Sequence, residues 1–526
     1  MSACDRPSSP RRPGMATGAL DAIELQVIAG ALRAACDEMG ATLVRAAHSA
    51  NIKERRDAST ALFDRRGEMT MQAEHIPVHL GSMPAALAAV LREDHRPGVS
   101  WVLNDPFAGG THLPDITVIT PVFADSLIGF AVSRAHHADV GGRVPGSMPA
   151  DSRTLEEEGV VIGPRPLTAA AVDELVAQMR NPDERRADLR AQLAANRIGA
   201  LRLAELGRRV GVERLLEATD AVLDYAERRM RACVAALPDG VREARDVLEA
   251  PEGDLRLCLR ATVDGERMTL DFSGSAGRHE GNLNCPLAVT LSACWFAVKV
   301  LTDPDIPSSA GAYRPVEVIV PEGSLLNAQP HGGGGGPGSA PAVAAGNVET
   351  SSRVADLVLG AFGRALGQGT MNNLTLGNED FTYYETLAGG QGACVDTDGP
   401  SGVHVAMSNT LNTPIEALER ELPVRVCEYA LRRGSGGAGA HRGGDGVVRE
   451  LRALTDMTFS LIAERREHSP PGAAGGEPGL CGRDTLIGLD GRSHRLAAKT
   501  TGTLHAGERL RIETPGGGGY GIASTD

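Results

Sequence analysis

The sequence predicts a mixed α/β (α+β) fold, and three observations support this prediction. A strongly helical stretch lies between residues 168 and 237. On either side of it, short apolar segments alternate with polar residues and with glycine or proline turns, a pattern typical of β-strands. No internal repeat of fixed period is present. With 526 residues, the chain is long enough for roughly two to four domains at about 150 residues each.

The predicted elements divide the chain into five regions. We expect a disordered leader, an α/β region that carries the candidate metal site, a helical region, an α/β substrate region and a β-rich C-terminal region. These regions correspond to residues 1–20, 21–165, 166–240, 241–421 and 422–526. The substrate region contains a low-complexity stretch at 331–341, HGGGGGPGSAP, which predicts a mobile loop.

Local signals define the elements of the first half of the chain. Asp21 can cap a helix together with Glu24, and apolar spacing continues this helix to about Ala47. Residues 58–74 predict two strands joined by a turn at Arg66-Gly67, and residues 115–133 predict two more.

The second half shows equally clear signals. Asn181-Pro182 begins a helix within the stretch 168–237, and Pro238-Asp239-Gly240 ends the helical run. Alternating residues around Asp264-Gly265 predict a hairpin over 254–273. A helix is expected at about 287–302, followed after 422 by short strands. The terminal TPGGGGYG predicts a flexible or closely approached backbone.

Composition excludes several classes of protein. The net charge of −14 argues against a nucleic-acid binder, which usually carries a basic patch. The chain contains no run of 18 consecutive apolar residues, so no membrane span is predicted. The nine cysteines are odd in number and form no CxxC pair, so a disulfide framework is not expected and the reduced cytoplasm is the predicted location.

The residues best suited to chemistry lie between 104 and 139. His112 and Asp115 are three apart in a glycine-rich turn that enters a strand, and His137 could join them from the end of the neighbouring strand. Imidazole and carboxylate are the usual ligands of Zn, Mn or Fe, and a catalytic site needs about three of them. The alternative is that these are polar loop residues satisfied by backbone hydrogen bonds.

Other polar segments offer weaker candidates. In NIKERRD (51–57), Glu54 and Asp57 could supply a general base or a further ligand, or could lie in a solvated turn. His75 and His79 are four apart, but Pro77 between them argues against a helical zinc pair and favours loop packing. Asparagine-rich segments, such as GNLNCP, AAGNVETSSR and TMNNLTLGN, could bind a polar amide or form turns. The chain contains no GxxxxGK[ST] or GxSxG motif.

At these motifs the chain resembles the hydantoinase B / oxoprolinase family. The likeness extends from about residue 21 to 521 and is carried by NIKERRDAS, AEHIPVHLGSMPAAL, LNDPFAGGTHLPDITVITPVF, SRAHHADVGGRVPGSMP, GNLNCPLAV, AAGNVETSSRVAD, SNTLNTPIEALERE and TPGGGGYG. The resemblance implies a multi-layer hydantoinase B-type fold. It also implies a hydantoinase A-type partner that binds ATP and Mg, and hence a hetero-oligomer.

The resemblance further implies a function. In such systems, ATP phosphorylates the oxygen of an unreactive cyclic amide, such as 5-oxoproline or a hydantoin, and the B-type subunit hydrolyses the activated ring. The related acetone carboxylase type carries a Mn site built from His, Asp and His, which His112, Asp115 and His137 fit. Glu54 and His136 are then candidates for proton transfer. Two alternatives are a subunit of an ATP-dependent ketone carboxylase and a non-catalytic scaffold for the ATP-binding partner.

Overall fold

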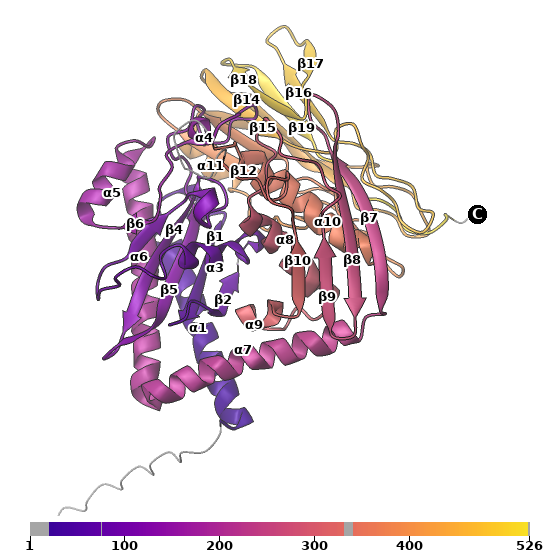
Figure 1. Cartoon of the computed structure of the whole chain (residues 1–526). Coiled ribbons are helices and arrows are strands. Elements are labelled where there is room, and N and C mark those ends of the chain that lie inside the picture. The colour runs from indigo at the N-terminus through magenta and orange to yellow at the C-terminus, as the bar shows by residue number, and fades with distance from the viewer. Residues whose placement is uncertain (1–19, 75, 331–339, 524–526) are drawn as a thin grey trace, which may run out of the picture.

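The computed structural model of the chain describes residues 20–74, 76–330 and 340–523, and it confirms the mixed α/β fold. Its strands form four β-sheets: the first lies at the left of Figure 1, the second at the right, and the last two, whose strands interleave along the chain, include the strands at the top. All of the predicted leader except Leu20, and residues 331–339 of the predicted loop, lie outside the described residues.

The first sheet has six strands in the order β2-β1-β5-β4-β3-β6. They are β1 (Ala58–Asp64), β2 (Met69–Glu74), β3 (Trp101–Leu103), β4 (Asp115–Phe123), β5 (Leu127–His136) and β6 (Arg165–Pro166). Helices α1 (Ala22–Ala46) and α6 (Pro182–Val210) pack against it. The Asp21 carboxylate accepts a hydrogen bond from the backbone N–H of Glu24, which confirms the predicted cap.

The two faces of this sheet contribute to different cores because successive residues of a strand point to opposite sides. Leu62 and Ala131 pack in the cluster that contains the buried residues of α1 and α6. Phe63 and Phe130 pack in the larger cluster, which extends toward the second sheet. This alternation also decides which residues at the strand ends reach the candidate site.

The stretch that the sequence predicted to be helical forms helices in the structure. It consists of α5 (Ala169–Val176), α6 and α7 (Val212–Ala235). Asn181 is the N-cap of α6 and Pro182 its first residue, as expected. Helix α7 runs along the base of the molecule from the first sheet toward the second (Figure 1).

The second sheet has the order β10-β9-β8-β7. Its strands are β7 (Gly240–Leu248), β8 (Leu255–Asp264), β9 (Arg267–Asp271) and β10 (Val316–Ile319). The predicted hairpin is confirmed, because β8 and β9 pair as far as Asp264 and Arg267. Helix α10 (Ser351–Ala361) packs on β7 and β8 and on α8 (Leu287–Leu301), the helix predicted at 287–302.

Two further sheets complete the chain, and their strand orders are β12-β11-β15-β18 and β13-β14-β19-β16-β17. Their strands are β11 (Asn373–Gly377), β12 (Thr382–Thr386), β13 (Val424–Arg432), β14 (Gly446–Ala453), β15 (Met457–Ile462), β16 (Arg483–Ile487), β17 (Ser493–Arg495), β18 (Lys499–Leu504) and β19 (Arg509–Glu513). Short helices occupy the connections: α2 (Ala50–Lys53), α3 (Ser82–Ala88), α4 (Leu155–Glu158), α9 (Ala310–Tyr313), α11 (Ile415–Glu421), 3-10 turns Pro77–His79 and Pro106–Ala108, and the π-helical turn Gly346–Thr350.

The terminal glycine run is a closely approached backbone, one of the two predicted forms. Residues Gly516–Gly519 are buried. A Cβ atom on Gly517 would lie 2.1 Å from the carbonyl oxygen of Gln391, so only glycine fits there. The Gly517 N–H donates to the carbonyl of Gly444 at 2.9 Å, which ties the chain end to the preceding loops.

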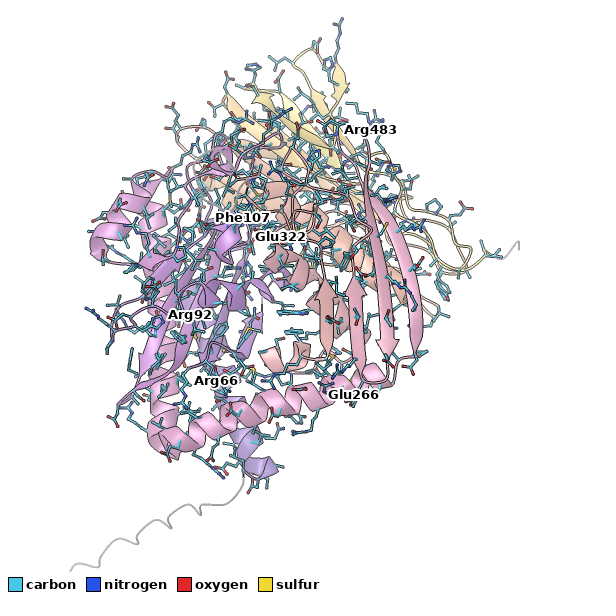
Figure 2. All side chains as sticks on the ribbon, in the orientation of Figure 1. Arg66, Arg92, Phe107, Glu266, Glu322 and Arg483 are labelled. Atoms are coloured by element: carbon cyan, nitrogen blue, oxygen red, sulfur yellow. The ribbon has the colours of Figure 1, made fainter. Side chains whose placement is uncertain are left out.

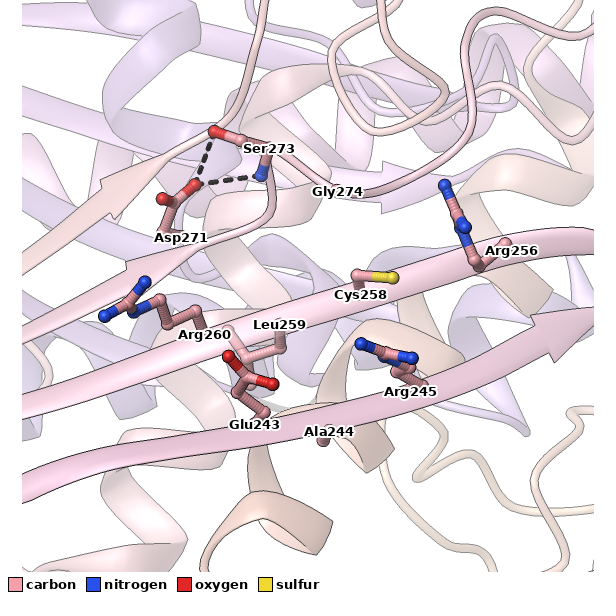
Figure 3. Close-up of a pocket in the computed structure, with 10 residues that line it drawn as sticks. All are labelled: Glu243, Ala244, Arg245, Arg256, Cys258, Leu259, Arg260, Asp271, Ser273 and Gly274. Atoms are coloured by element: carbon pink, nitrogen blue, oxygen red, sulfur yellow. Dashed lines mark hydrogen bonds between the residues drawn. The ribbon is translucent and has the colours of Figure 1, made fainter.

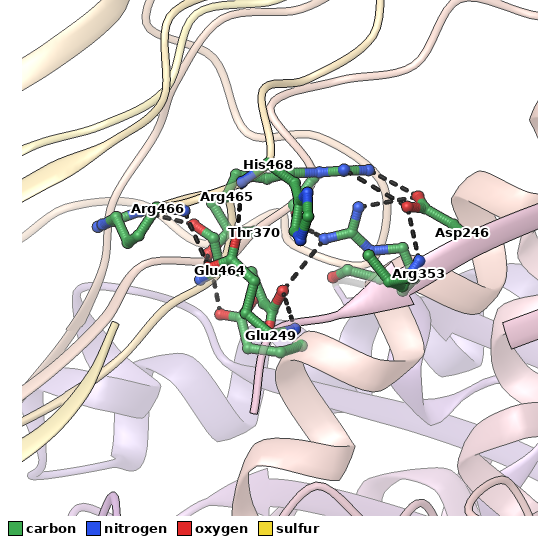
Figure 4. Close-up of polar contacts among 12 residues, drawn as sticks. Asp246, Glu249, Arg353, Thr370, Glu464, Arg465, Arg466 and His468 are labelled. Carbon is green, nitrogen blue, oxygen red and sulfur yellow. Dashed lines mark hydrogen bonds and ion pairs between the residues drawn. The ribbon is translucent and has the colours of Figure 1, made fainter. Parts of the chain in front are cut away.

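A buried group of charged side chains, here called the ionic cluster, joins distant parts of the chain (Figure 4). Arg353 of α10 pairs with Asp246 of β7 at 2.9 Å and lies 3.4 Å from Glu464. Glu464 also accepts from Lys499 of β18 at 2.6 Å. Arg465 pairs with Asp246 at 2.7 Å. The second sheet, α10 and the C-terminal sheets are therefore connected by compensated charges.

The surface is charged, as side chains such as Arg92, Glu266 and Arg483 illustrate (Figure 2). A hollow of about 330 Å³ lies over β7 and β8 and is lined by Arg245, Arg256, Arg260 and the half-buried Cys258, among others (Figure 3). All eight cysteines in the described part of the chain are free. Among the described helices, none combines the length and apolar character needed to cross a bilayer.

Candidate metal centre

The ends of three neighbouring strands bring together a group of buried side chains. Strand β4 begins at Asp115 and β5 ends at His136, and the antiparallel register places these two residues opposite each other. Asp57 immediately precedes β1, and its carbonyl accepts a hydrogen bond from the backbone N–H of His136 at 3.0 Å. Strand pairing alone therefore places two carboxylates and one imidazole at the same end of the three inner strands β1, β5 and β4.

Two more histidines approach from loops. His79 ends the 3-10 turn Pro77–His79, and its Nε2 lies 3.5 Å from Oδ2 of Asp115. His112 lies three residues before Asp115, and its Nδ1 is 3.1 Å from the same oxygen. Nδ1 of His136 lies 3.3 Å from the other oxygen, Oδ1. Asp115 is therefore the centre of the group, which we call the histidine cluster: Asp57, His79, His112, Asp115 and His136.

The donor atoms of the histidine cluster fall into two sets of the size that holds a metal ion. One set is His112, Asp115 and His136, and the other is Asp57, His79 and Asp115. Within each set, the ligand atoms lie within 4.8 Å of one another. All five side chains are buried.

Several of these buried polar atoms have no hydrogen-bond partner. They are Nε2 of His79, His112 and His136, and Oδ1 of Asp115. Buried polar atoms are nearly always satisfied, and an exception needs an explanation such as a bound ion. Imidazole nitrogen and carboxylate oxygen are the donor set preferred by Zn, Mn and Fe. The residues present therefore fit a divalent transition metal.

The protonation states also fit metal binding. Burial alone would raise the pKa of Asp115, but the electrostatic effect of the neighbouring imidazoles, that of His112 above all, holds that pKa well below its usual range. Burial lowers the pKa of His136, since the charged imidazolium is poorly solvated there. Carboxylate and neutral imidazole are the forms that ligate a cation.

Surrounding residues hold the ligands in place. The His136 ring stacks on Tyr384 with 4.5 Å between centroids, and the Arg55 guanidinium lies 4.4 Å from the centroid of the same tyrosine. Tyr384 donates from its hydroxyl to Oδ1 of Asn373 at 2.7 Å. Nδ1 of His112 lies 2.7 Å from the amide nitrogen of Asn347, in the π-helical turn. Such contacts orient metal-binding histidines.

The family follows from a comparison with known proteins. The family model described as hydantoinase B/oxoprolinase matches residues 21–523. The chain belongs to this family. It is 38% identical to 5-oxoprolinase 1 of Arabidopsis thaliana, an alignment that covers 96% of this chain but only 42% of that protein. This hydantoinase B-type chain thus spans less than half the length of that relative.

Solved structures share the fold. The crystal structure of an ATP-dependent caprolactamase from Pseudomonas jessenii superposes with a TM-score of 0.87 at 28% identity, covering 96% of this chain and 92% of that one. A nucleotide-free acetone carboxylase structure gives a TM-score of 0.84 at 19% identity, over 95% of this chain and 75% of that one. The second likeness concerns the fold alone.

The structure does not bring all the sequence-predicted ligands together. His112 and Asp115 are adjacent, but His137 lies apart, with its Nε2 3.0 Å from Oε1 of Gln192 on α6. Burial lowers the pKa of His137 to about 4, so it is neutral there. His136, assigned from sequence to proton transfer, takes the position expected of His137. This arrangement has a simple cause: neighbouring residues along an extended strand point to opposite faces.

Of the other residues considered from the sequence, some lie in the histidine cluster and others do not. Asp57 is in the cluster, whereas Glu54 is half-buried at the end of α2 and is not among the donor groups of the described residues. His79, for which the sequence favoured loop packing, is in the cluster. His75 lies outside the described residues. The position of His79 between two strands, after NIKERRD and before HLPD, is the only sequence signal that hinted at it.

The asparagine-rich segments have mixed roles. Asn284 of GNLNCP donates from its side chain to the carbonyls of His279, Gly281 and Ala342, and so supports loops. Asn347 of AAGNVETSSR reaches the histidine cluster, although 235 residues separate it from His112. Nothing local in the sequence distinguishes these two asparagines, because only the packing of the π-helical turn brings Asn347 to the site.

Proposed function

We propose that this chain is the hydrolytic B-type subunit of an ATP-dependent cyclic amidase, and that His112, Asp115 and His136 hold its metal ion. The observation that carries the proposal is the buried histidine cluster, whose ligand atoms lie within 4.8 Å of one another in each set and which contains ring nitrogens without hydrogen-bond partners. The family and the caprolactamase relative support a ring-opening reaction on a cyclic amide.

The chemistry of the amide bond explains why two subunits would be needed, one for phosphorylation and one for hydrolysis. An amide carbonyl is a poor electrophile, and phosphorylation converts its oxygen into a leaving group. We propose that a separate hydantoinase A-type subunit carries out this ATP- and Mg-dependent step. The oxoprolinase relative, more than twice as long as this chain, supports an additional unit for it. This chain would then hydrolyse the activated ring in the cytoplasm as part of a hetero-oligomer.

The residues of this chain have distinct proposed roles. When bound, a divalent metal would supply Lewis-acid polarisation and lower the pKa of a water molecule at neutral pH. Asp115 supplies the central carboxylate, and His112 and His136 supply ring nitrogens. Tyr384 and Asn347 fix the two rings in orientation. Glu54, half-buried outside the cluster, stays a candidate for proton transfer with the substrate bound.

The first test is metal content. Purified wild-type chain, loaded with Zn²⁺ or Mn²⁺ and desalted, is expected to retain metal, whereas His112→Ala and His136→Ala are expected to lose it. His137→Gln is the matched control: it is also a buried histidine, but its ring contacts Gln192 and not the cluster. Retention of metal by His136→Ala together with loss by His137→Gln would contradict the ligand assignment.

The second test is activity with the partner. Co-purified with a hydantoinase A-type subunit, the chain is expected to hydrolyse 5-oxoproline, a hydantoin or caprolactam only when ATP is present. ATP-dependent incorporation of bicarbonate into acetone or acetophenone would instead support a ketone carboxylase, the alternative that the family resemblance leaves open. Full turnover by the metal-depleted His112→Ala complex would support a scaffold role.

A further inference from the structure

We infer that the exposed face of α1 is the surface that binds the hydantoinase A-type subunit, and that this partner presents an apolar surface bordered by carboxylates. This inference rests on the proposed function, which requires such a partner, and it names the place on this chain where the partner binds. The surface consists of the first half of α1 and the two hollows beside it, and it includes none of the residues of the histidine cluster.

The first half of α1 presents an apolar stripe to solvent. Ile23 and Val27 are 77% and 60% exposed, and they are the most exposed large apolar side chains on the helices that the structure describes. Gly30 and Ala34 continue the same face at helical spacing and are also exposed. We call these four residues the α1 stripe. No residue of α1 before Ile28 is buried, so the helix begins outside the core.

Two hollows border the α1 stripe, one on each side of the helix. A hollow of about 410 Å³ lies between α1 and α6, and Ala34 is among the residues that line it. A hollow of about 200 Å³ lies between α1 and α7, and Gly30 lines that one. A partner that covers the stripe would therefore also reach buried apolar side chains in both hollows: Leu32 and Leu203 in the first, and Met71 and Val222 in the second. Contiguous exposed apolar surface of this kind marks interaction sites.

Exposed cations flank the α1 stripe on both sides. Arg209 lines the hollow beside α6, and Arg33 lines the hollow beside α7. Within the described part of the chain neither forms an ion pair, whereas the neighbouring Arg202 is paired with Glu38 and Glu205. Interfaces combine an apolar centre with a polar rim, and arginine binds carboxylates with paired hydrogen bonds. The complementary surface is therefore apolar at its centre and carries Asp or Glu at its border.

The length of a relative places the additional unit near one end of the shared chain. The alignment with the Arabidopsis 5-oxoprolinase 1 is 546 residues long and covers 96% of this chain, so it leaves no room for a second unit as an insertion. Most of the unmatched length of that relative therefore precedes or follows the matched part. The family match begins at residue 21, beside the α1 stripe. At the opposite end, Gly516–Gly519 are buried.

These two ends lie apart in space. Helix α1 begins at the base of the molecule, below α7, whereas the C-terminal end lies at the right (Figure 1). A unit joined ahead of α1 would meet the α1 stripe at once, and a separate subunit that replaces this unit can use the same contact. We therefore place the partner at the α1 end, where an apolar helix face is available.

The experiment measures binding of the full-length chain to the immobilised hydantoinase A-type subunit used in the activity test. Ile23→Glu/Val27→Glu is expected to raise the Kd by about tenfold or more, because two charges would be buried in an apolar interface. Leu454→Glu/Leu489→Glu is the matched control, since it adds the same charges at apolar side chains that are 51% and 74% exposed near the last sheet. This control is expected to keep the wild-type Kd.

A second variant, Gly30→Gln, separates binding from folding. A Cβ atom on Gly30 would meet no atom within 4 Å, and any residue other than glycine or proline favours a helix more than glycine does. The variant is therefore expected to unfold at the wild-type temperature or above it. It is nevertheless expected to bind the partner less tightly, because its side chain projects from the middle of the α1 stripe. Thermal unfolding and the same binding assay measure the two effects.

The outcomes separate this inference from the proposed function. Binding that is equal in the wild type and in both α1 variants would overturn the inference and leave the proposed function intact. No binding by the wild type would overturn both the inference and the proposed partner. If light scattering shows that Ile23→Glu/Val27→Glu converts a dimer of the isolated chain to a monomer, the stripe binds a second copy and the inference is wrong. Faster tryptic cleavage within residues 1–19 of that variant would assign the stripe to this segment instead, which would also overturn the inference.

Discussion

Two buried polar groups of this molecule are built on opposite principles. In the ionic cluster, each cation contacts a carboxylate: Arg353, Arg465 and Lys499 each pair with Asp246 or Glu464. In the histidine cluster, ring nitrogens and one carboxylate oxygen are buried without partners. In the first arrangement the opposite charges compensate one another within the protein, although Nε of Arg353 and Nε of Arg465 have no hydrogen-bond partner. In the second, the unpartnered atoms belong to possible metal ligands, which is why we propose that an ion completes it.

The largest effect is expected from breaking the ionic cluster. Arg353→Met leaves Asp246 and Glu464 with one buried cation fewer. Removing one partner of a buried pair typically costs about 3–5 kcal/mol, because an uncompensated charge stays behind. Urea unfolding measures this loss. The control is Arg202→Met, whose pairs with Glu38 and Glu205 are solvent-exposed and worth at most about 1 kcal/mol. Equal losses in the two variants would show that the ionic cluster is not a structural junction.

Metal is expected to stabilise the histidine cluster and not the ionic one. Mn²⁺ at 100 times its dissociation constant should raise the free energy of unfolding of the wild type by about 2.7 kcal/mol, since only the folded state presents the site. Thermal unfolding with and without the ion tests this. His112→Ala should lose the stabilisation, and Arg353→Met should keep it. An equal response in all three proteins would mean that the ion binds elsewhere.

The acidity of Glu349, a buried carboxyl in the π-helical turn near Glu464 of the ionic cluster, provides a third test. Burial, together with the nearby charge of Glu464, raises the pKa of Glu349 from 4.5 to about 8. The folded state therefore keeps its proton between these pH values, while the unfolded state loses it, so stability falls as pH rises through this window. Since one unit of pKa difference is worth about 1.4 kcal/mol, the difference between 4.5 and about 8 sets an upper bound of about 5 kcal/mol on this loss.

Glu349→Gln should remove that part of the pH dependence and be more stable than the wild type at pH 8. Unfolding midpoints at pH 5, 6.5 and 8 measure the slope. Glu205→Gln, which alters an exposed carboxyl, should keep the wild-type slope. A slope unchanged in Glu349→Gln would show that Glu349 is ionised in the folded protein.

The smallest effect concerns the support of the histidine cluster. Tyr384→Phe keeps the ring stacked on His136 but removes the hydroxyl that donates to Asn373. We expect a loss of about 1 kcal/mol, the typical worth of one hydrogen bond, with metal content unchanged. Tyr429→Phe is the control, because its hydroxyl bonds to Asn412 at the surface, where water can replace it. Metal loss in Tyr384→Phe would show that the hydroxyl itself contributes to the site.

Local patterns in the sequence predicted the elements well because their causes are local. The cap at Asp21, the start of α6 at Asn181-Pro182 and the hairpin around Asp264-Gly265 each depend on neighbours a few residues away. For the terminal glycines, local patterns could not decide between a flexible backbone and a closely approached one. Their close approach depends on Gln391 and Gly444, which come from other parts of the chain.

The candidate site shows the same division. The spacing of His112 and Asp115, together with the family resemblance, predicted that the two act together, and Nδ1 of His112 lies 3.1 Å from Oδ2 of Asp115. The choice between His136 and His137 depended on strand register, and a shift of one residue changes the face to which a side chain points. His79 and Asn347 became visible only through loop packing.

The sequence by itself therefore determined the family resemblance, the order of helices and strands, and the segment that carries the ligands. The tertiary structure alone decided which four side chains meet around Asp115 and which polar atoms are left without a partner. The physical reason is that helix caps and hairpins are satisfied by near neighbours, whereas a metal centre is assembled from strand ends and loops. The position of each of its donors depends on the packing of the whole chain.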